Sequence, residues 1–457
     1  MKSGNSYLKL LGARILSELN DIKRTPEAAA EELGLTQEFM DGVLSGEKEI
    51  EDSLKLIRLM GDSYPIDESD LYLVPNDTVH GVKIMRASDS KKSRRIFDRP
   101  NKDGIRTPYY DYRDTAMSKL AAFKPEWIQE LRVVSDSDPE NPDVVYNNGH
   151  FMHQMTFFIG PVNFYYEING KKYCREMNTG DSNYITPFFR HSFTNRNKDE
   201  FALIVAVTFG GNVRRAQKEI YSLGNKSSSY MLDFRNTNKA ISQLIKQHIR
   251  NENFTEKSLL KQLNSIGIDI DLKLLLDENE PKNLTDLKKL ADFLNVEVSD
   301  MLIPTYKPDE DVVIRHKKEN EASFYPNDDL KLYRIFRLAR SSKMPLLKGF
   351  SVDVLTDTPD LENGFESSLH QYIYNYGEED AHFHWISEDQ IITDTLKAGD
   401  SAYVQPFVKY AFGCTSEKEA RIFTVGISGA IDLATQKELS YFSSMERVIY
   451  ETKKWFN

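Results

Sequence analysis

Apolar residues near the N-terminus recur at helical spacing. The positions that share one face of this helix are Leu8, Leu11, Ile15, Leu16 and Leu19. Residues 25–27, Thr-Pro-Glu, then supply an N-cap, a proline at the first helical position and an acid in the first turn. Gly34 marks a turn and the Ser-Gly pair at 45–46 a stop. The pattern predicts several short helices, with a further helix over 53–62.

From Tyr72 onward the pattern changes to short apolar runs separated by Gly, Asn, Asp and Pro. Examples are HQMTFFIG at 153–160, NFYYEING at 163–170, NYITPFF at 183–189 and FALIVAVTFGG at 201–211. Many short strands at this spacing are typical of a β-sandwich or barrel. The two short helices around Gly34 resemble a helix-turn-helix of the phage-repressor type.

This succession of helices and strands occurs twice along the chain. The repeats, in order, are Ser-Asp-Leu at 69–71 and Ser-Asp-Met at 299–301, His-Gln at 153–154 and 370–371, Gly-Asp-Ser-Asn-Tyr-Ile-Thr-Pro-Phe at 180–188 and Gly-Asp-Ser-Ala-Tyr-Val-Gln-Pro-Phe at 399–407, and Gln-Lys-Glu at 217–219 and 436–438. Helical patterns over 259–276 and 284–294 stand where the first helices stood. Repeats that recur in the same order indicate an internal duplication.

A Gly-Asp-x5-Pro turn followed by a histidine resembles the second motif of the cupin barrel. The sequence therefore predicts an α+β protein, a tandem duplication of a helix-turn-helix-like α-helical domain plus a cupin (double-stranded β-helix) barrel. The expected domains are a helical domain at 1–70, a catalytic cupin barrel at 71–230, a second helical domain at 231–305 and a degenerate cupin barrel without a metal site at 306–457.

Composition narrows the class of protein. The 457 residues are 40% hydrophobic and 28% charged, which is typical of a globular multidomain chain. A net charge of -11 disfavours non-specific binding of nucleic acid. The two cysteines, Cys174 and Cys414, form no paired motif, which favours a reducing cytoplasm. No signal peptide and no membrane helix are expected.

Three residues supply a candidate metal site. Two histidines plus one oxygen donor on one face leave open positions on the metal, as in non-haem Fe(II) oxygenases. His150, Gln154 and His191 are such a set. In a straight strand, His150 and Gln154 would lie roughly 13 Å apart, so they share an ion only if the chain turns or bulges near Gly149. The competing interpretation is that all three are solvated or packed residues at strand ends.

The second copy provides an internal comparison. Ser367 stands at the place of His150, and Tyr410 stands at the place of His191. Since both histidines are absent together from one copy, we expect them to act together in the other.

Other polar residues of these motifs are interpreted differently. Gln154 is matched by Gln371, so the comparison does not single it out. His153 keeps a counterpart in His370, which favours a structural role. The His-x-His at 382–384 lacks a third donor, so we expect no metal there.

The spacing Asn147-x-x-His150-x-x-x-Gln154, with His191 after the proline-containing turn, resembles the iron site of the phosphonate-processing cupin oxygenases. Members of this family are hydroxypropylphosphonate epoxidase, hydroxyethylphosphonate dioxygenase and methylphosphonate synthase. The resemblance covers essentially the whole chain, and the tandem copy is like the hydroxyethylphosphonate enzymes.

The resemblance also implies a reaction. The epoxidase has Glu in place of Gln154, and the dioxygenase takes its carboxylate from six residues before the second histidine, where this chain has Ile185. A two-His, one-Gln site resembles that of methylphosphonate synthase. This implies an Fe(II) cofactor and conversion of 2-hydroxyethylphosphonate and O2 to methylphosphonate and bicarbonate or CO2, with C–C cleavage and without 2-oxoglutarate.

Substrate-binding residues follow from the same resemblance. Asn147 matches an asparagine that contacts the phosphonate. Lys23 matches a lysine that enters an active site, in some members that of a neighbouring subunit, which leaves a homo-oligomer open. The segment 106–112 resembles the Arg and Tyr cluster that holds the phosphonate, with Arg106 and Tyr112 as its expected members. Lys23 and Tyr112 are also the expected catalytic residues. The alternative for Arg106 and Tyr112 is that they are a surface arginine and a packed tyrosine.

Three other functions remain open, one enzymatic and two non-enzymatic. Hydroxyethylphosphonate dioxygenase, which forms hydroxymethylphosphonate and formate, is the nearer one. A helix-turn-helix joined to a cupin is also the architecture of a transcription regulator, but the candidate reading helix at 36–44 carries two acids and no base. A cupin that binds a small ligand without turnover is a third reading.

Overall fold

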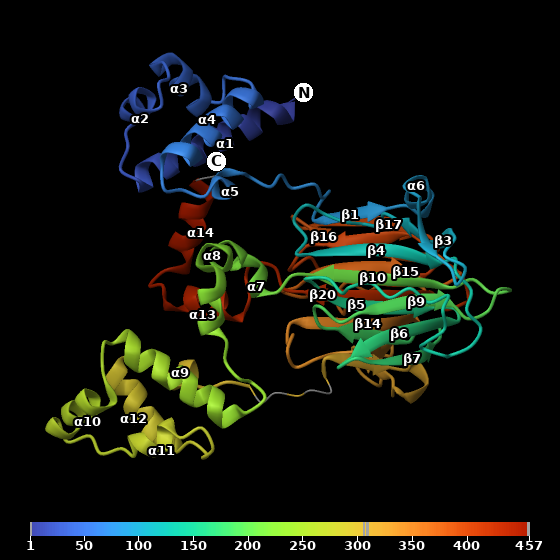
Figure 1. Cartoon of the computed structure of the whole chain (residues 1–457). Coiled ribbons are helices and arrows are strands. Elements are labelled where there is room, and N and C mark those ends of the chain that lie inside the picture. Colours follow the sequence, from blue (N-terminus) through green and yellow to red (C-terminus); the bar gives the residue numbers. More distant parts are fainter. Residues whose placement is uncertain (1, 305–306, 308–309, 455–457) are drawn as a thin grey trace. The chain divides into compact units, whose positions relative to one another are not determined.

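The structure is a computed structural model that describes residues 2–304, 307 and 310–454. These residues divide into two compact units (Figure 1). One unit contains the segments up to 209, 314–340 and from 344 onward, and the other contains 210–313 with 341–343. The expected domain boundary at 305/306 lies outside the described residues.

The N-terminal segment forms short helices around one apolar core. They are α1 (Lys2–Asp21), α2 (Pro26–Glu32), α3 (Gln37–Leu44), α4 (Ile50–Ser63) and α5 (Glu68–Leu71). The Thr25 and Thr36 hydroxyls cap α2 and α3. Leu11, Ile15 and Leu19 are fully buried, as the apolar spacing predicts. Leu16 was expected on the same face but is 36% exposed, because the buried face of α1 is narrower than the apolar pattern.

The strands that follow form antiparallel sheets. They are β1 (Val82–Met85), β2 (Arg95–Pro100), β3 (Arg106–Arg113), β4 (Phe123–Glu130), β5 (His153–Ile159), β6 (Val162–Ile168), β7 (Lys171–Met177), β8 (Ser182–Ile185), β9 (His191–Asn195) and β10 (Leu203–Phe209), with helix α6 (Ala87–Lys92) between β1 and β2. The sheet β11-β8-β5-β10-β4-β3-β2 packs against the smaller sheet β7-β6-β9. These two sheets are called the first barrel.

A second set of strands repeats this arrangement. It comprises β11 (Val312–Arg315), β12 (Ser323–Tyr325), β13 (Tyr333–Arg337), β14 (Leu347–Val354), β15 (His370–Asn375), β16 (Ala381–Ser387), β17 (Gln390–Leu396), β18 (Ser401–Val404), β19 (Tyr410–Cys414) and β20 (Arg421–Ile427). The sheet β1-β18-β15-β20-β14-β13-β12 packs against β17-β16-β19 around one apolar core. These two sheets are called the second barrel.

The two barrels exchange one strand each, which the sequence did not predict. β1 comes from the first half of the chain but pairs with β18, with Val82 opposite Val404. β11 comes from the second half and is the neighbour of β8 in the first barrel. The expected barrel domains at 71–230 and 306–457 are therefore not closed on themselves, because β1 and β11 each pair with a strand of the other domain.

The repeated Gly-Asp turns anchor the exchanged segments. The Asp181 carboxylate accepts a hydrogen bond from the backbone amide of Lys317 at 2.8 Å. In the other copy, the Asp400 carboxylate accepts from the Ala87 amide at 2.8 Å and from Arg86 Nη1 at 2.9 Å. Both carboxylates are buried, at 4% and 2% exposed. The shared aspartate therefore serves the fold in both copies.

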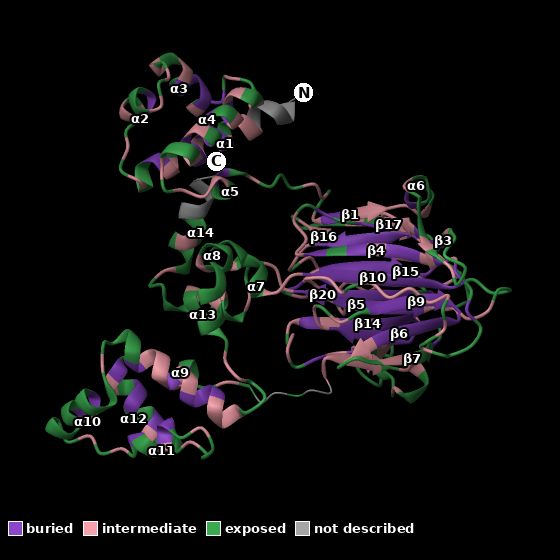
Figure 2. Cartoon of the chain, viewed as in Figure 1, coloured by how far each residue is buried: buried purple, intermediate pink, exposed green. Residues whose placement is uncertain are grey.

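The large sheets of the two barrels pack against each other. The Phe157 and Phe423 rings stack at 4.7 Å, and Trp127 Nε1 donates to the Tyr374 hydroxyl at 3.1 Å. Each central strand, β10 and β20, therefore has one face in its own barrel and the other near the neighbouring barrel, and is buried almost throughout (Figure 2). Burial on both faces explains the nearly continuous apolar run of β10.

Helices form the remainder of the described chain. They are α7 (Asn212–Arg215), α8 (Gln217–Leu223), η1 (Gly224–Tyr230), α9 (Thr237–Asn251), α10 (Glu256–Ser265), α11 (Leu272–Leu276), α12 (Leu284–Leu294), η2 (Val298–Met301), η4 (Lys317–Glu319), α13 (Leu433–Tyr441) and α14 (Met445–Lys454). α12 has the predicted bounds, whereas the pattern over 259–276 is split into α10 and α11. Residues 212–230 and 433–454, expected inside the barrels, are helical or lie between helices. No helix in the described part of the chain is long and apolar enough to cross a membrane.

Candidate metal centre

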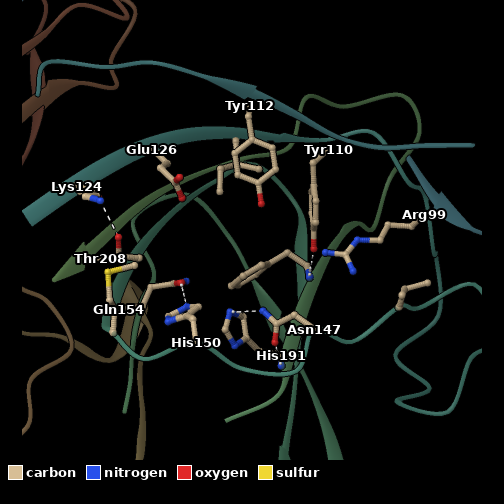
Figure 3. A pocket seen from close by; sticks show the side chains of 14 residues that line it. Arg99, Tyr110, Tyr112, Lys124, Glu126, Asn147, His150, Gln154, His191 and Thr208 are labelled. Carbon is tan, nitrogen blue, oxygen red and sulfur yellow. Dashed lines mark hydrogen bonds between the residues drawn. The ribbon is translucent and has the colours of Figure 1, made fainter. Parts of the chain in front are cut away.

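A cavity of about 300 Å³ opens in the first barrel between β3, β4, β5 and β9. Its polar lining residues are Arg99, Tyr110, Tyr112, Lys124, Glu126, Asn147, His150, Gln154, His191 and Thr208. Figure 3 shows His150, Gln154 and His191 near one another, with Glu126, Tyr112 and Tyr110 pointing toward them from the opposite side. The cavity is large enough for a small ligand.

A turn before β5 brings His150 to Gln154. Gly149 has φ +72°, and a Cβ there would lie 2.5 Å from the Phe188 backbone, so only glycine fits. The Asn147 side-chain oxygen accepts from the amides of Gly149 at 2.9 Å and His191 at 3.0 Å. This asparagine therefore ties the turn to the start of β9.

The three candidate ligands converge as a result. His150 Nε2 lies 3.1 Å from Gln154 Oε1, and the His150 and His191 rings are 5.2 Å apart. The Gln154 amide nitrogen donates to Thr156 Oγ1 at 2.8 Å, which turns the amide oxygen toward His150. Thus the chain turns as the shared-ion hypothesis requires, and the straight-strand separation does not apply.

The donor set fits a divalent metal ion. His191 Nδ1 lies 2.9 Å from the Phe189 carbonyl, so it carries the proton and leaves Nε2 a lone pair. His150 Nδ1 is buried without a hydrogen-bond partner, while its Nε2 faces Gln154 Oε1 at 3.1 Å. Among the described residues no three His, Cys, Asp or Glu side chains are grouped around one point, and the candidate third donor beside the two histidines is the amide oxygen of Gln154.

Burial sets the protonation of the cavity. It lowers the pKa of His191 to about 4, so this imidazole is neutral near neutral pH and free to bind a metal. Burial raises the pKa of Tyr112, which therefore keeps its proton and is a hydrogen-bond donor. Burial also raises the pKa of Glu126, against the opposing effect of His150.

Three charged lining residues were not predicted from the sequence. Arg99 on β2 and Lys124 on β4 add cations to the cavity, and Glu126 adds an acid. Arg99 reaches toward Tyr110 and Asn147 (Figure 3). Strand alternation puts Lys124, Glu126 and Ile128 on one face of β4. No spacing in the sequence, however, indicates that this face lines the same cavity as His150.

Two predicted substrate residues are not brought to the cavity. Arg106 begins β3 and is exposed, and its Nη2 donates to the Asp98 carbonyl at 2.6 Å. Six residues at about 3.3 Å each separate it from Tyr112 along the strand, roughly 20 Å in all. Lys23 lies after α1 with φ +59°, and its exposed Nζ donates to the Asn20 carbonyl at 3.3 Å. Neither lines the cavity.

The second barrel differs from the first at the position of the second histidine, as the sequence comparison indicated. Tyr410 donates a hydrogen bond to Gln371 Oε1 at 2.7 Å, so a phenol occupies the position of the second histidine. His153 and His370 make equivalent contacts, to the hydroxyls of Tyr184 at 2.8 Å and Tyr403 at 2.6 Å. That equivalence supports a structural role for His153.

A buried carboxyl lies beside the tyrosine cluster. Glu130 on β4 is opposite Tyr110, is 2% exposed, and neither of its oxygens has a hydrogen-bond partner. Burial raises its pKa well above the ordinary value of 4.5. The second barrel has Val354 at the same register, opposite Tyr333.

We expect Glu130→Met to raise the melting temperature, and the gain to be larger at high pH. In the unfolded chain the carboxyl ionises near 4.5, whereas the folded chain keeps it protonated to higher pH, so its burial costs stability increasingly as pH rises above 4.5. Differential scanning fluorimetry of wild type and variant across a pH series measures the difference. A gain that shrinks toward alkaline pH would contradict an uncompensated buried carboxyl.

Comparison with known proteins gives matches over nearly the whole chain. The chain is 39% identical to methylphosphonate synthase of Nitrosopumilus maritimus (strain SCM1) over 462 residues, which covers 99% of this chain and 97% of that protein. It is also similar to a Streptomyces albus 2-hydroxyethylphosphonate dioxygenase solved with 2-hydroxyethylphosphonate and Fe(II) bound. That match has a TM-score of 0.86 and 33% identity over 97% of each chain.

A more distant structure has the same fold. A hydroxyethylphosphonate dioxygenase variant is 17% identical, with a TM-score of 0.71 over 97% of this chain and 99% of that one. No protein-family model matches the chain.

Proposed function

The chain belongs to the family of methylphosphonate synthase and 2-hydroxyethylphosphonate dioxygenase, and we propose that it converts 2-hydroxyethylphosphonate and O2 to methylphosphonate and bicarbonate or CO2. It is an oxygen-dependent non-haem iron oxidoreductase. The synthase assignment, rather than the dioxygenase one, rests on the third donor. Gln154 faces His150, whereas Ile185, at the place of the dioxygenase carboxylate, is an apolar residue only 1% exposed.

Iron would be held by His150, Gln154 and His191, and Fe(II) there would supply the activation of O2. The chain's own residues do the rest. Arg99 and Lys124 carry charge complementary to a phosphonate. Tyr112, which holds its proton, would donate a hydrogen bond to the substrate in the cavity. Asn147 contributes its amide, which lies 3.0 Å from His191 Nε2.

The wider organisation is part of the proposal. We propose that the chain arose by tandem duplication of a helix-turn-helix-like domain plus a cupin barrel, supported by the matching strand order of the two large sheets. Lys23 would act in this proposal only after motion of its helices or in a neighbouring subunit of a homo-oligomer. The two free cysteines, Cys174 and Cys414, support a cytoplasmic location.

Phosphorus NMR of the reaction products tests the function. Protein loaded anaerobically with Fe(II) is given 2-hydroxyethylphosphonate and O2 without 2-oxoglutarate, and we expect methylphosphonate. Hydroxymethylphosphonate with formate would show the dioxygenase reaction instead. Absence of O2 consumption together with DNA binding would show a regulator.

Gln154→Glu is expected to change the product ratio. The substitution adds a negative charge at the metal and removes the amide N–H that bonds Thr156, so anionic species bind less favourably there. We expect hydroxymethylphosphonate to increase relative to methylphosphonate, measured by phosphorus NMR. Gln371→Glu in the second barrel is the matched control and should leave the ratio unchanged. An unaltered ratio in Gln154→Glu would refute a role for ligand charge in product choice.

A further inference from the structure

The second barrel contains its own cavity, of about 360 Å³. It opens at the position that the iron site occupies in the first barrel, because Ser367, Gln371 and Tyr410 all line it. These are the counterparts of His150, Gln154 and His191. The second copy has therefore kept a cavity after replacing two metal ligands.

Strand registers show which other residues have changed. In the pairing of β4 with β10, Lys124 lies opposite Thr208, one position from the end. In the equivalent pairing of β14 with β20, Lys348 lies opposite Gly426, also one position from the end, so the two lysines correspond. Two residues farther along each strand, Glu126 corresponds to Phe350.

The pairing of β3 with β4 and its equivalent, β13 with β14, also show a polar residue replaced by an apolar one. Tyr112 is opposite Ile128 in the first barrel, and Ile335 is opposite Val352 in the second, so a tyrosine corresponds to an isoleucine. At these positions the second cavity therefore has apolar side chains in place of an acid and a phenol, and it has the same lysine.

A buried amide donor lies in the wall of this cavity. Gln371 is 6% exposed, and its amide oxygen accepts from the Tyr410 hydroxyl at 2.7 Å. Its amide nitrogen is buried and has no hydrogen-bond partner. A buried N–H without a partner is unfavourable unless a ligand accepts from it.

Cations surround the same cavity. Arg337 and Lys348 line it, and within the described chain no ion pair holds either side chain. A third cation, Arg340, stacks on the lining ring of Phe350 at 4.9 Å. Glu366 is the acid in the lining and is exposed at the rim. Cations therefore exceed acids around an aromatic wall formed by Phe350 and Phe365.

We propose that the second barrel binds a small organic anion, a carboxylate or phosphonate with a short apolar group, without a metal. Arg337 and Lys348 neutralise its charge, and the Gln371 amide donates to one of its oxygens. The aromatic wall packs against its apolar group. Binding of this kind is independent of the reaction proposed for the first barrel.

Isothermal titration calorimetry of the full-length, metal-free protein tests this site. The probes are butyrate and propylphosphonate, with inorganic phosphate as the probe that lacks an apolar group. We expect at least one organic probe to bind at one site per chain with a dissociation constant on the order of 1 mM or below, and phosphate to bind about tenfold more weakly. The tighter probe identifies the preferred head group.

Matched variants locate the binding. Arg337→Ala combined with Lys348→Ala should weaken binding at least about tenfold, and Gln371→Leu should weaken it separately. Lys124→Ala, the equivalent change in the first barrel, should leave it unaltered. Thermal melting shows that each variant is folded. Absence of binding by wild type, equal affinity for phosphate, or weakening by Lys124→Ala alone would each overturn the proposal.

Discussion

Alanine at His150 or at His191 is expected to abolish iron binding and turnover. In the proposed centre each imidazole supplies one of three protein donors, and no group of three His, Cys, Asp or Glu side chains is found in the described chain to take their place. Because changes that merely support a ligand already cost about 10- to 100-fold in metal affinity, loss of a ligand should cost at least about 100-fold. Iron content of the purified protein and O2 consumption with 2-hydroxyethylphosphonate are the measurements.

The second barrel supplies the matched control for this experiment. Ser367→Ala and Tyr410→Phe alter the counterparts of the two histidines, and both variants should retain wild-type iron content. Wild type should hold one iron per chain rather than two, since a serine and a phenol stand at these positions in the second copy. Full iron content in His150→Ala, or loss of iron in Tyr410→Phe, would contradict the assigned centre.

Replacement of Arg99 by methionine is expected to raise KM for 2-hydroxyethylphosphonate by about 10- to 100-fold, the usual range for a charge-assisted hydrogen bond. The guanidinium reaches into the cavity beside Tyr110 and Asn147, and no ion pair in the described structure holds it. Methionine keeps most of the apolar stem and removes the charge. Steady-state O2 consumption at varied substrate concentration measures KM and kcat separately.

Arg106→Met is the control for the arginine assignment. The sequence pattern favoured Arg106, whereas the structure places it exposed at the start of β3 and bonded to the Asp98 carbonyl. Its KM should stay within about twofold of wild type, as for a surface substitution. Were Arg106→Met to raise KM and Arg99→Met to leave it unchanged, the arginine suggested by the sequence would be the correct one.

The parts of the fold that could be predicted are those that depend on residues close together in the sequence. The caps at Thr25 and Thr36 and the buried Leu11, Ile15 and Leu19 follow from side-chain spacing alone. Strand formation in segments such as β5 and β10 follows from their apolar runs. The exchange of β1 and β11 does not, because it depends on pairing between residues far apart in the chain, such as Val82 with Val404.

The sequence by itself indicated the repeated unit. Because Ser367 and Tyr410 replace two histidines in the second copy, it also indicated which two histidines of the first copy act together. Comparison within one chain was sufficient because corresponding positions of the two copies have equivalent backbone surroundings. Only the tertiary structure showed that Gln154 reaches His150, since that depends on the turn at Gly149. The structure also places Arg99, and not Arg106, at the cavity, because a cavity gathers side chains by strand register and not by sequence distance. The candidate metal ligands can thus be recognised from short motifs in the sequence, whereas the residues of the opposite cavity wall are brought together only by folding.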